Sequence, residues 1–222
     1  MPKATLLASA SAALLIAAGF TAGPALAKRT APARSGMVVT QQDVRTCIGV
    51  NGSSAAEQII ACTKIINSGK IHHPHEGDYY ATRGAAYYAT KQFDTALADY
   101  NKALSFEQKG EFYFQRALIL MAMSEVEKAK ADFAEVVKLR PDFAPTYFMR
   151  GLISYQAADY KAAIEDFDIA VRRNPTYYQA IFARGAAKTR LGDDSGGNDD
   201  LKQARGIGAH VDDDMKTFGV VP

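Results

Sequence analysis

The feature that most constrains this chain is an internal repeat of 33 or 34 residues. Four segments align, starting at Gly77, Gly110, Ala144 and Tyr178, with spacings of 33, 34 and 34 residues. Each has an aromatic or Ile anchor (Tyr80, Tyr113, Tyr147, Ile181), an Arg three residues later (Arg83, Arg116, Arg150, Arg184) and then a small residue (Gly84, Ala117, Gly151, Gly185). Periods of this length are typical of helical repeats that bury their apolar faces only by stacking on neighbours.

The second half of each repeat follows the same register. A small residue (Ala96, Ala129, Ala163, Gly197) precedes, by four positions, a large apolar one (Tyr100, Phe133, Phe167, Leu201). Pro141 and Pro175 close the second and third repeats, where Pro cannot donate the bond that a continuing helix needs. These offsets resemble the tetratricopeptide-repeat family, although Gln108 and Ala209 replace the closing Pro in the first and fourth repeats.

The resemblance implies an all-α fold, a right-handed solenoid of about four helix pairs over residues 77–205. We expect the first repeat to contain helices at about 78–90 and 94–105, the second capped by Asp94. A helical lid is predicted over residues 43–76, with a capping box made by Ser54 and Glu57. A capping helix is predicted over residues 206–222, because Val211, Met215 and Phe218 fall on one helical face.

The N-terminus has the pattern of a secretory signal peptide. Lys3 precedes an uncharged apolar run, and Ala25-Leu26-Ala27 provides the small residues of a cleavage site. We therefore predict a signal peptide at 1–27, a flexible mature segment at 28–42, and a periplasmic or secreted protein without stable membrane insertion. No Cys follows Ala27, so a lipoprotein is not expected; the alternative is an uncleaved anchor.

Two cysteines, Cys47 and Cys62, lie in the predicted lid. In an oxidising compartment, two such thiols indicate one disulfide, which would contribute about 3 kcal/mol by constraining the unfolded chain. Two free buried thiols are the alternative.

An Arg and an Asp sixteen residues later recur in every repeat. The pairs are Arg83 and Asp99, Arg116 and Asp132, Arg150 and Asp166, and Arg184 and Asp200. Because both positions lie near the seam between the two helices, we predict four structural ion pairs. A ladder of ligand-binding groups is the alternative.

The resemblance also implies that the first helix of each repeat builds an inner, partner-binding surface. Its predicted side chains are apolar or aromatic: Phe114, Phe148, Phe182, Tyr88, Met121, Leu118, Leu152 and Tyr155. An apolar peptide or partner helix is therefore the predicted ligand. The alternative is that the chain itself covers these rings, for example with Met37, Val38 and Val39.

A cluster of histidines indicates one other kind of chemistry. His72, His73 and His75 could bind zinc or copper, which makes an exported metal-handling or stress-related protein the alternative function. A formal charge of +2 without a basic stripe argues against nucleic-acid binding. We find no nucleophile motif and no phosphate-binding loop, so we predict a non-enzymatic envelope scaffold without a cofactor.

Overall fold

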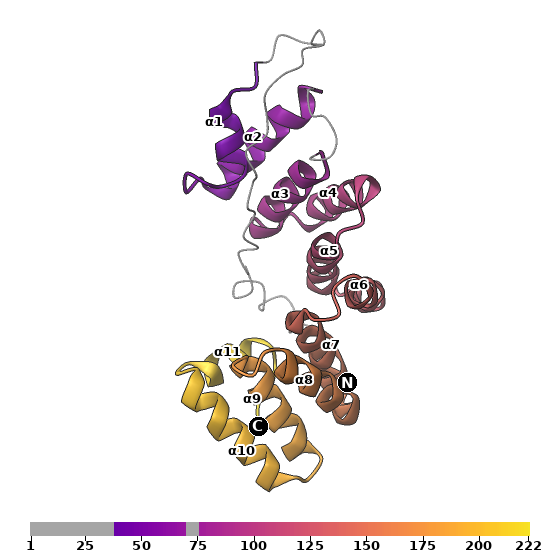
Figure 1. Cartoon of the computed structure of the whole chain (residues 1–222), viewed down its shortest axis with the longest axis vertical. Coiled ribbons are helices and arrows are strands. Elements are labelled where there is room, and N and C mark those ends of the chain that lie inside the picture. The colour runs from indigo at the N-terminus through magenta and orange to yellow at the C-terminus, as the bar shows by residue number, and fades with distance from the viewer. Residues whose placement is uncertain (1–37, 70–75) are drawn as a thin grey trace. The chain divides into compact units, whose positions relative to one another are not determined.

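The computed structural model describes residues 38–69 and 76–222, and every regular element in these ranges is an α-helix (Figure 1). The predicted all-α class is therefore confirmed. The predicted signal peptide, most of the mature segment 28–42 and the three clustered histidines lie outside the described residues. Among the helices that are described, none is long and apolar enough to cross a membrane.

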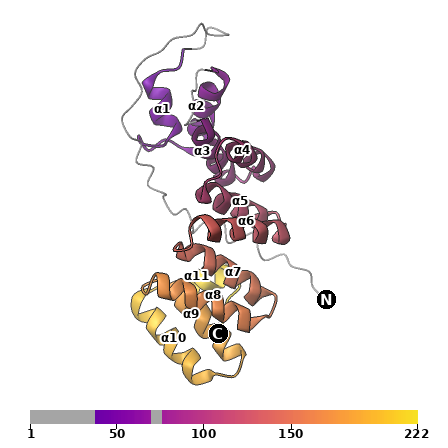
Figure 2. The ribbon, with the colours of Figure 1, turned by 45° about the vertical axis from the view of Figure 1, so that its right-hand side comes forward.

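The chain forms two compact units, which divide between Ile119 and Leu120. The N-terminal unit contains α1 (Gln41–Cys47), α2 (Ala55–Asn67), α3 (Glu76–Ala89) and α4 (Phe93–Phe106), and α5 (Gly110–Ala122) crosses the division. The C-terminal unit holds α6 (Val126–Leu139), α7 (Ala144–Gln156), α8 (Tyr160–Arg173), α9 (Tyr178–Arg190), α10 (Asp194–Ile207) and α11 (Val211–Thr217). Figure 2 shows α9 and α10 side by side as one pair of packed helices.

Small residues let the two helices of a repeat approach closely, as the pattern predicts. Gly151 on α7 faces the ring of Phe167 on α8, and a methyl group there would lie 2.5 Å from a ring carbon. Phe167 and Ala163 are both fully buried. The apolar positions of the repeat therefore form the core between paired helices.

The turn inside each repeat has one residue with a left-handed backbone. These residues are Lys91 (φ 60°), Ser124 (φ 63°), Ala158 (φ 60°) and Gly192 (φ 87°), each fifteenth in its repeat. The turn shifts the start of the second helix: in the first repeat that helix begins at Phe93, so Asp94 is in its first turn and is not the N-cap.

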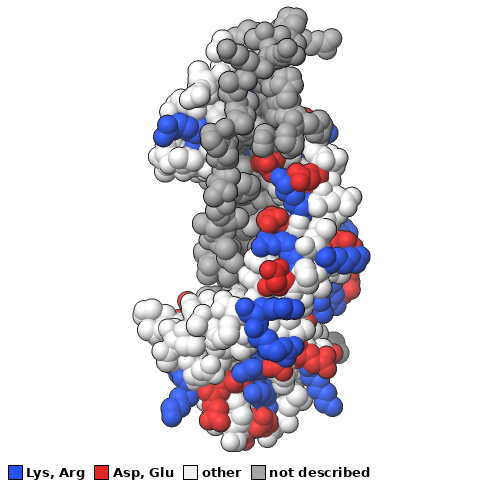
Figure 3. Space-filling model, viewed as in Figure 1, with Lys and Arg blue, Asp and Glu red and all other residues white. Residues whose placement is uncertain are grey.

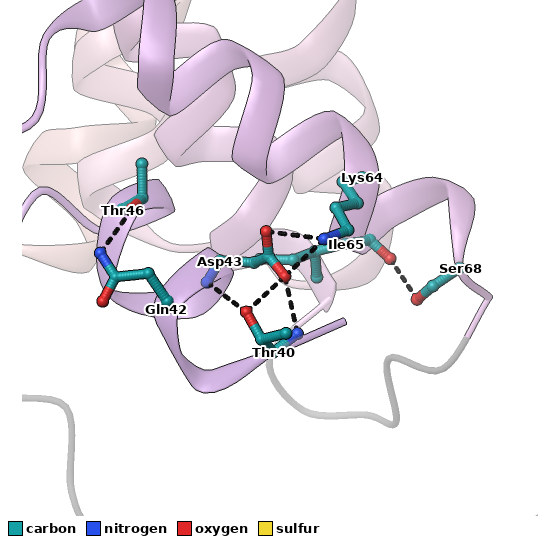
Figure 4. A network of polar contacts seen from close by, with 7 residues as sticks. All are labelled: Thr40, Gln42, Asp43, Thr46, Lys64, Ile65 and Ser68. Carbon is teal, nitrogen blue, oxygen red and sulfur yellow. Dashed lines mark hydrogen bonds and ion pairs between the residues drawn. The ribbon is translucent and has the colours of Figure 1, made fainter. Parts of the chain in front are cut away.

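The N-terminal helices begin with two capping boxes. The predicted box of Ser54 and Glu57 starts α2. A second box, made by Thr40 and Asp43, starts α1 at Gln41, inside the stretch predicted to be flexible. Figure 4 shows that the Asp43 carboxylate also accepts from the Lys64 ammonium at 2.8 Å, which joins α1 to α2. The hydrogen bond from Lys64 and the capping bonds lower the pKa of Asp43 to about 2.

Candidate functional site

The inner-face side chains predicted to bind a partner are mostly inside the core. Phe148 is fully buried, Phe182 is 1% exposed and Phe114 is 4% exposed. Leu118, Met121, Leu152 and Tyr155 are also buried, and Tyr88 alone among the eight is half-buried. These side chains are therefore mostly covered in this structure, in line with the alternative that the chain itself buries them, and their role in partner binding stays a prediction.

The C-terminal segment explains the burial of Phe148. The Phe218 ring, just after α11, meets Phe148 edge-on with ring centroids 5.7 Å apart. Tyr177 flanks Phe148 from another side at 5.2 Å. The predicted apolar stripe of the C-terminal helix is buried, since Val211 and Met215 have no exposed surface.

Polar contacts hold the same segment by its main chain. The Tyr155 hydroxyl donates to the carbonyl oxygen of Val221 at 3.0 Å, and the Gln156 amide donates to that of Phe218 at 3.3 Å. An aromatic contact and two side-chain hydrogen bonds to main-chain carbonyls therefore hold this segment against α7. Here α7 binds a segment of its own chain.

Of the three residues suggested as a cover, Met37 lies outside the described residues, and Val38 and Val39 lie elsewhere. Val38 is 69% exposed, and Val39 packs against the buried cluster around Cys47 and Cys62. In this cluster the two sulfurs form a disulfide with an S–S distance of 2.06 Å. The bond joins α1 to α2 beside the Asp43–Lys64 ion pair.

The predicted Arg–Asp pairs are tight in the first and fourth repeats. Arg83 donates to both oxygens of Asp99 at 2.8 and 2.7 Å, and the Asp99 hydrogen bond raises the pKa of Arg83. Arg184 donates to both oxygens of Asp200 at 2.8 and 2.6 Å. Burial opposes the charge of Asp200, but hydrogen bonds from Arg184 and Lys188 outweigh it and lower the pKa of Asp200. Paired charges at the seam fit a structural role.

Each of these Arg residues also bonds to the preceding helical pair. Arg184 Nη1 donates to Asp168 at 2.8 Å, and Arg83 Nη1 donates to Thr63 at 3.1 Å. Arg116 Nη1 donates to Asn101 at 2.8 Å, and its pairing with Asp132 stays a prediction. This second acceptor was not predicted, although Asn101 and Asp168 occupy the same repeat position.

The third repeat is different. Arg150 approaches Asp166 at 3.2 Å through one nitrogen, and its side chain is 38% exposed, compared with 16% for Arg184. Burial raises the pKa of Asp166 to about 6, and the attraction of Arg150 offsets that effect only in part. The predicted pair is present, but it is loose.

Charges of both signs alternate on the face shown in Figure 3. Within residues 38–69 and 76–222, no group of three or more His, Cys, Asp or Glu side chains could hold a metal ion. The prediction that His72, His73 and His75 bind a metal lies outside the described residues.

Comparison with known proteins agrees with this architecture. The tetratricopeptide-repeat model matches residues 77–109, 110–143 and 144–177. The fourth helix pair, α9 and α10, follows the same register outside those matches. Residues 77–177 are therefore identified as three tetratricopeptide repeats. No curated protein matches it.

Among solved structures, a crystal structure of MamA is similar over 71% of this chain and 90% of its own, with a TM-score of 0.63 and 18% identity. MamA from Desulfovibrio magneticus RS-1 (residues 41 to the end) is similar over 77% and 97%, with a TM-score of 0.65 and 14% identity. YrrB, described as a TPR protein with an unusual peptide-binding site, is similar over 72% and 80%, with a TM-score of 0.58 and 15% identity. At these identities the similarity establishes the fold.

Proposed function

We propose that this protein is a non-enzymatic scaffold that binds a segment of a partner protein. The observation that carries the proposal is the C-terminal segment on α7, where aromatic packing and side-chain donors to main-chain carbonyls hold a stretch of chain. The peptide-binding site named for YrrB, a protein of the same fold, adds support.

The partner surface that we propose is on α3, in the first repeat. Because Phe148, Leu152 and Tyr155 are already covered, an external segment would have to displace the C-terminal segment to reach them. On α3, Tyr80, Tyr87 and Tyr88 are all half-buried, so each keeps exposed surface. Tyrosines that are partly exposed and ordered by their neighbours are favourable contact residues, because little side-chain entropy is lost on binding.

A photo-crosslinking amino acid at position 88 tests this surface in living cells. We expect one specific adduct from position 88 and none from position 98, an exposed alanine on α4 in the same repeat. The protein in that adduct, once purified, should bind the wild-type chain, and Tyr88→Glu should weaken its affinity by roughly tenfold or more. Equal crosslinking from both positions, or unchanged affinity of Tyr88→Glu, would exclude this surface.

We further propose that the protein is exported to the cell envelope. The signal-peptide pattern of residues 1–27 supports export, and so does a disulfide, which is rare in reducing compartments. The mass of the protein isolated from its source, after alkylation without reduction, should correspond to a start at Lys28 with two unalkylated cysteines. A retained N-terminus with both thiols alkylated would contradict export.

A further inference from the structure

A cavity of about 420 Å³ opens between α6, α7 and α8 in the C-terminal unit. Its lining includes Lys130 and Ala134 from α6, Arg150 and Ser154 from α7, and Glu165 and Asp166 from α8. The cavity therefore lies at the loose ion pair of the third repeat.

The residue at position 134, which lines the cavity, differs from its equivalents in the neighbouring repeats. Asn101, Ala134 and Asp168 are each twenty-fifth in their repeat. Asn101 and Asp168 accept a hydrogen bond from the Arg of the following repeat, at 2.8 Å in both cases. Ala134 has no acceptor to offer Arg150, and both residues line the cavity.

The fourth repeat shows what Arg150 lacks. Arg184 lies between two carboxylates, with Nε and Nη2 on Asp200 and Nη1 on Asp168. Among the described residues, the structure gives Arg150 one carboxylate, that of Asp166. A guanidinium group has five donors in a fixed fork, which suits it to a second carboxylate.

We propose that this cavity binds a carboxylate group, which takes beside Arg150 the place that Asp168 takes beside Arg184. Lys130, whose ammonium is exposed and pairs with Glu127 at 2.8 Å, adds a second cation at the rim. Glu165 is exposed, so water screens its repulsion of the ligand. The carboxylate comes from an acidic side chain of a protein or from a free carboxylic acid. The proposal does not depend on the α3 surface.

The test uses NMR of the purified protein, with the Arg150 Nε–H resonance as the readout. Sodium acetate is titrated at constant ionic strength against sodium chloride, and a second titration uses aspartate blocked at both ends as a mimic of a protein side chain. We expect a saturable shift with at least one carboxylate and none with chloride. Saturation with acetate identifies the carboxylate alone as sufficient, and saturation only with blocked aspartate assigns the site to a protein side chain.

Ala134→Asp supplies the missing acceptor from the chain itself and should reduce the apparent affinity roughly tenfold or more. Ala131→Asp is the matched control, because Ala131 is exposed on the same helix and does not line the cavity. It adds the same charge and should bind as the wild type does. Arg150→Lys, followed through the Ala134 amide, should also lose most of the response. No saturable shift with either carboxylate, or equal binding by Ala134→Asp and the wild type, would overturn the proposal.

Discussion

The third and fourth repeats have equivalent helix pairs, with Arg and Asp at the same repeat positions, yet their ion pairs differ. Arg184 is bidentate to Asp200 and has Asp168 as a second acceptor, whereas Arg150 touches Asp166 through one nitrogen at 3.2 Å. The pKa of Asp200 is lowered and that of Asp166 is raised to about 6. Arg184 has Asp168 as a second acceptor, whereas the equivalent position beside Arg150 is Ala134. The same Arg and Asp motif can therefore stabilise one repeat and be available to a ligand in another.

The largest expected effect is on the fourth pair. Asp200→Ala leaves Arg184 and Lys188 without their shared carboxylate, and we expect a loss of about 3 kcal/mol in the free energy of unfolding. Asp166→Ala should change it by less than about 1 kcal/mol, because Asp166 is desolvated and poorly compensated. Urea denaturation followed by circular dichroism measures both. Equal losses would remove the distinction between the two repeats.

The next largest effect on stability is expected from Gly151 and Gly185, which follow Arg150 and Arg184 and lie at the contact between paired helices. A Cβ at position 185 would lie 2.8 Å from the carbonyl oxygen of Gly197, and one at position 151 would lie 2.5 Å from the Phe167 ring. We expect Gly185→Ala and Gly151→Ala each to destabilise by about 2 kcal/mol, because neither neighbour can move freely. The same denaturation assay applies. A neutral effect at both sites would show that the seam is looser than the structure indicates.

Substitutions at the left-handed residue of the turn should have opposite effects on stability in the third and fourth repeats. Ala158 has a φ of 60° and Gly192 has 87° at the equivalent position, a region that costs an L-residue about 1 kcal/mol. Ala158→Gly should therefore stabilise by about that amount, and Gly192→Ala should destabilise by as much. Melting temperatures of the two variants against the wild type check this. Shifts of the same sign in both would contradict it.

The smallest expected effect is the pH dependence of the third pair. Between its ordinary value of 3.8 and about 6, Asp166 holds a proton in the folded chain that the unfolded chain has lost. Its contribution to stability is therefore present at low pH and is lost as the pH rises through about 6. The melting temperature of the wild type minus that of Asp166→Asn should fall between about pH 4 and 6 and level off above that range. A difference that stays constant across this range would be inconsistent with a raised pKa.

Local features of the fold could be predicted from the sequence. The repeat register located the helix pairs and their small contact positions, and the capping box of Ser54 and Glu57 starts α2 as expected. The predicted start at Asp94 was wrong, because the left-handed residue Lys91 shortens the turn and the helix begins at Phe93. Errors of this kind arise where backbone geometry, which side-chain periodicity does not report, decides the boundary.

The candidate site was less predictable because it depends on contacts between distant residues. Periodicity placed Phe148 on an apolar face, but it could not identify Phe218, seventy positions later, as the ring that covers it. The alignment of the repeats shows that Ala134 stands where the neighbouring repeats have Asn101 and Asp168. The alignment does not show that Asn101 and Asp168 accept hydrogen bonds from Arg116 and Arg184, so the consequence of an alanine at position 134 could not be predicted.

The most direct test of this account is a double-mutant cycle between Ala134→Asp and Arg150→Ala, measured by urea denaturation. If Ala134 is the reason that the third pair is open, Ala134→Asp should be more favourable by about 0.5 to 1 kcal/mol in the chain that contains Arg150 than in the Arg150→Ala chain, as expected for a partly exposed ion pair. In the Arg150→Ala background the same substitution should give no gain. An equal effect of Ala134→Asp in both backgrounds would contradict the account.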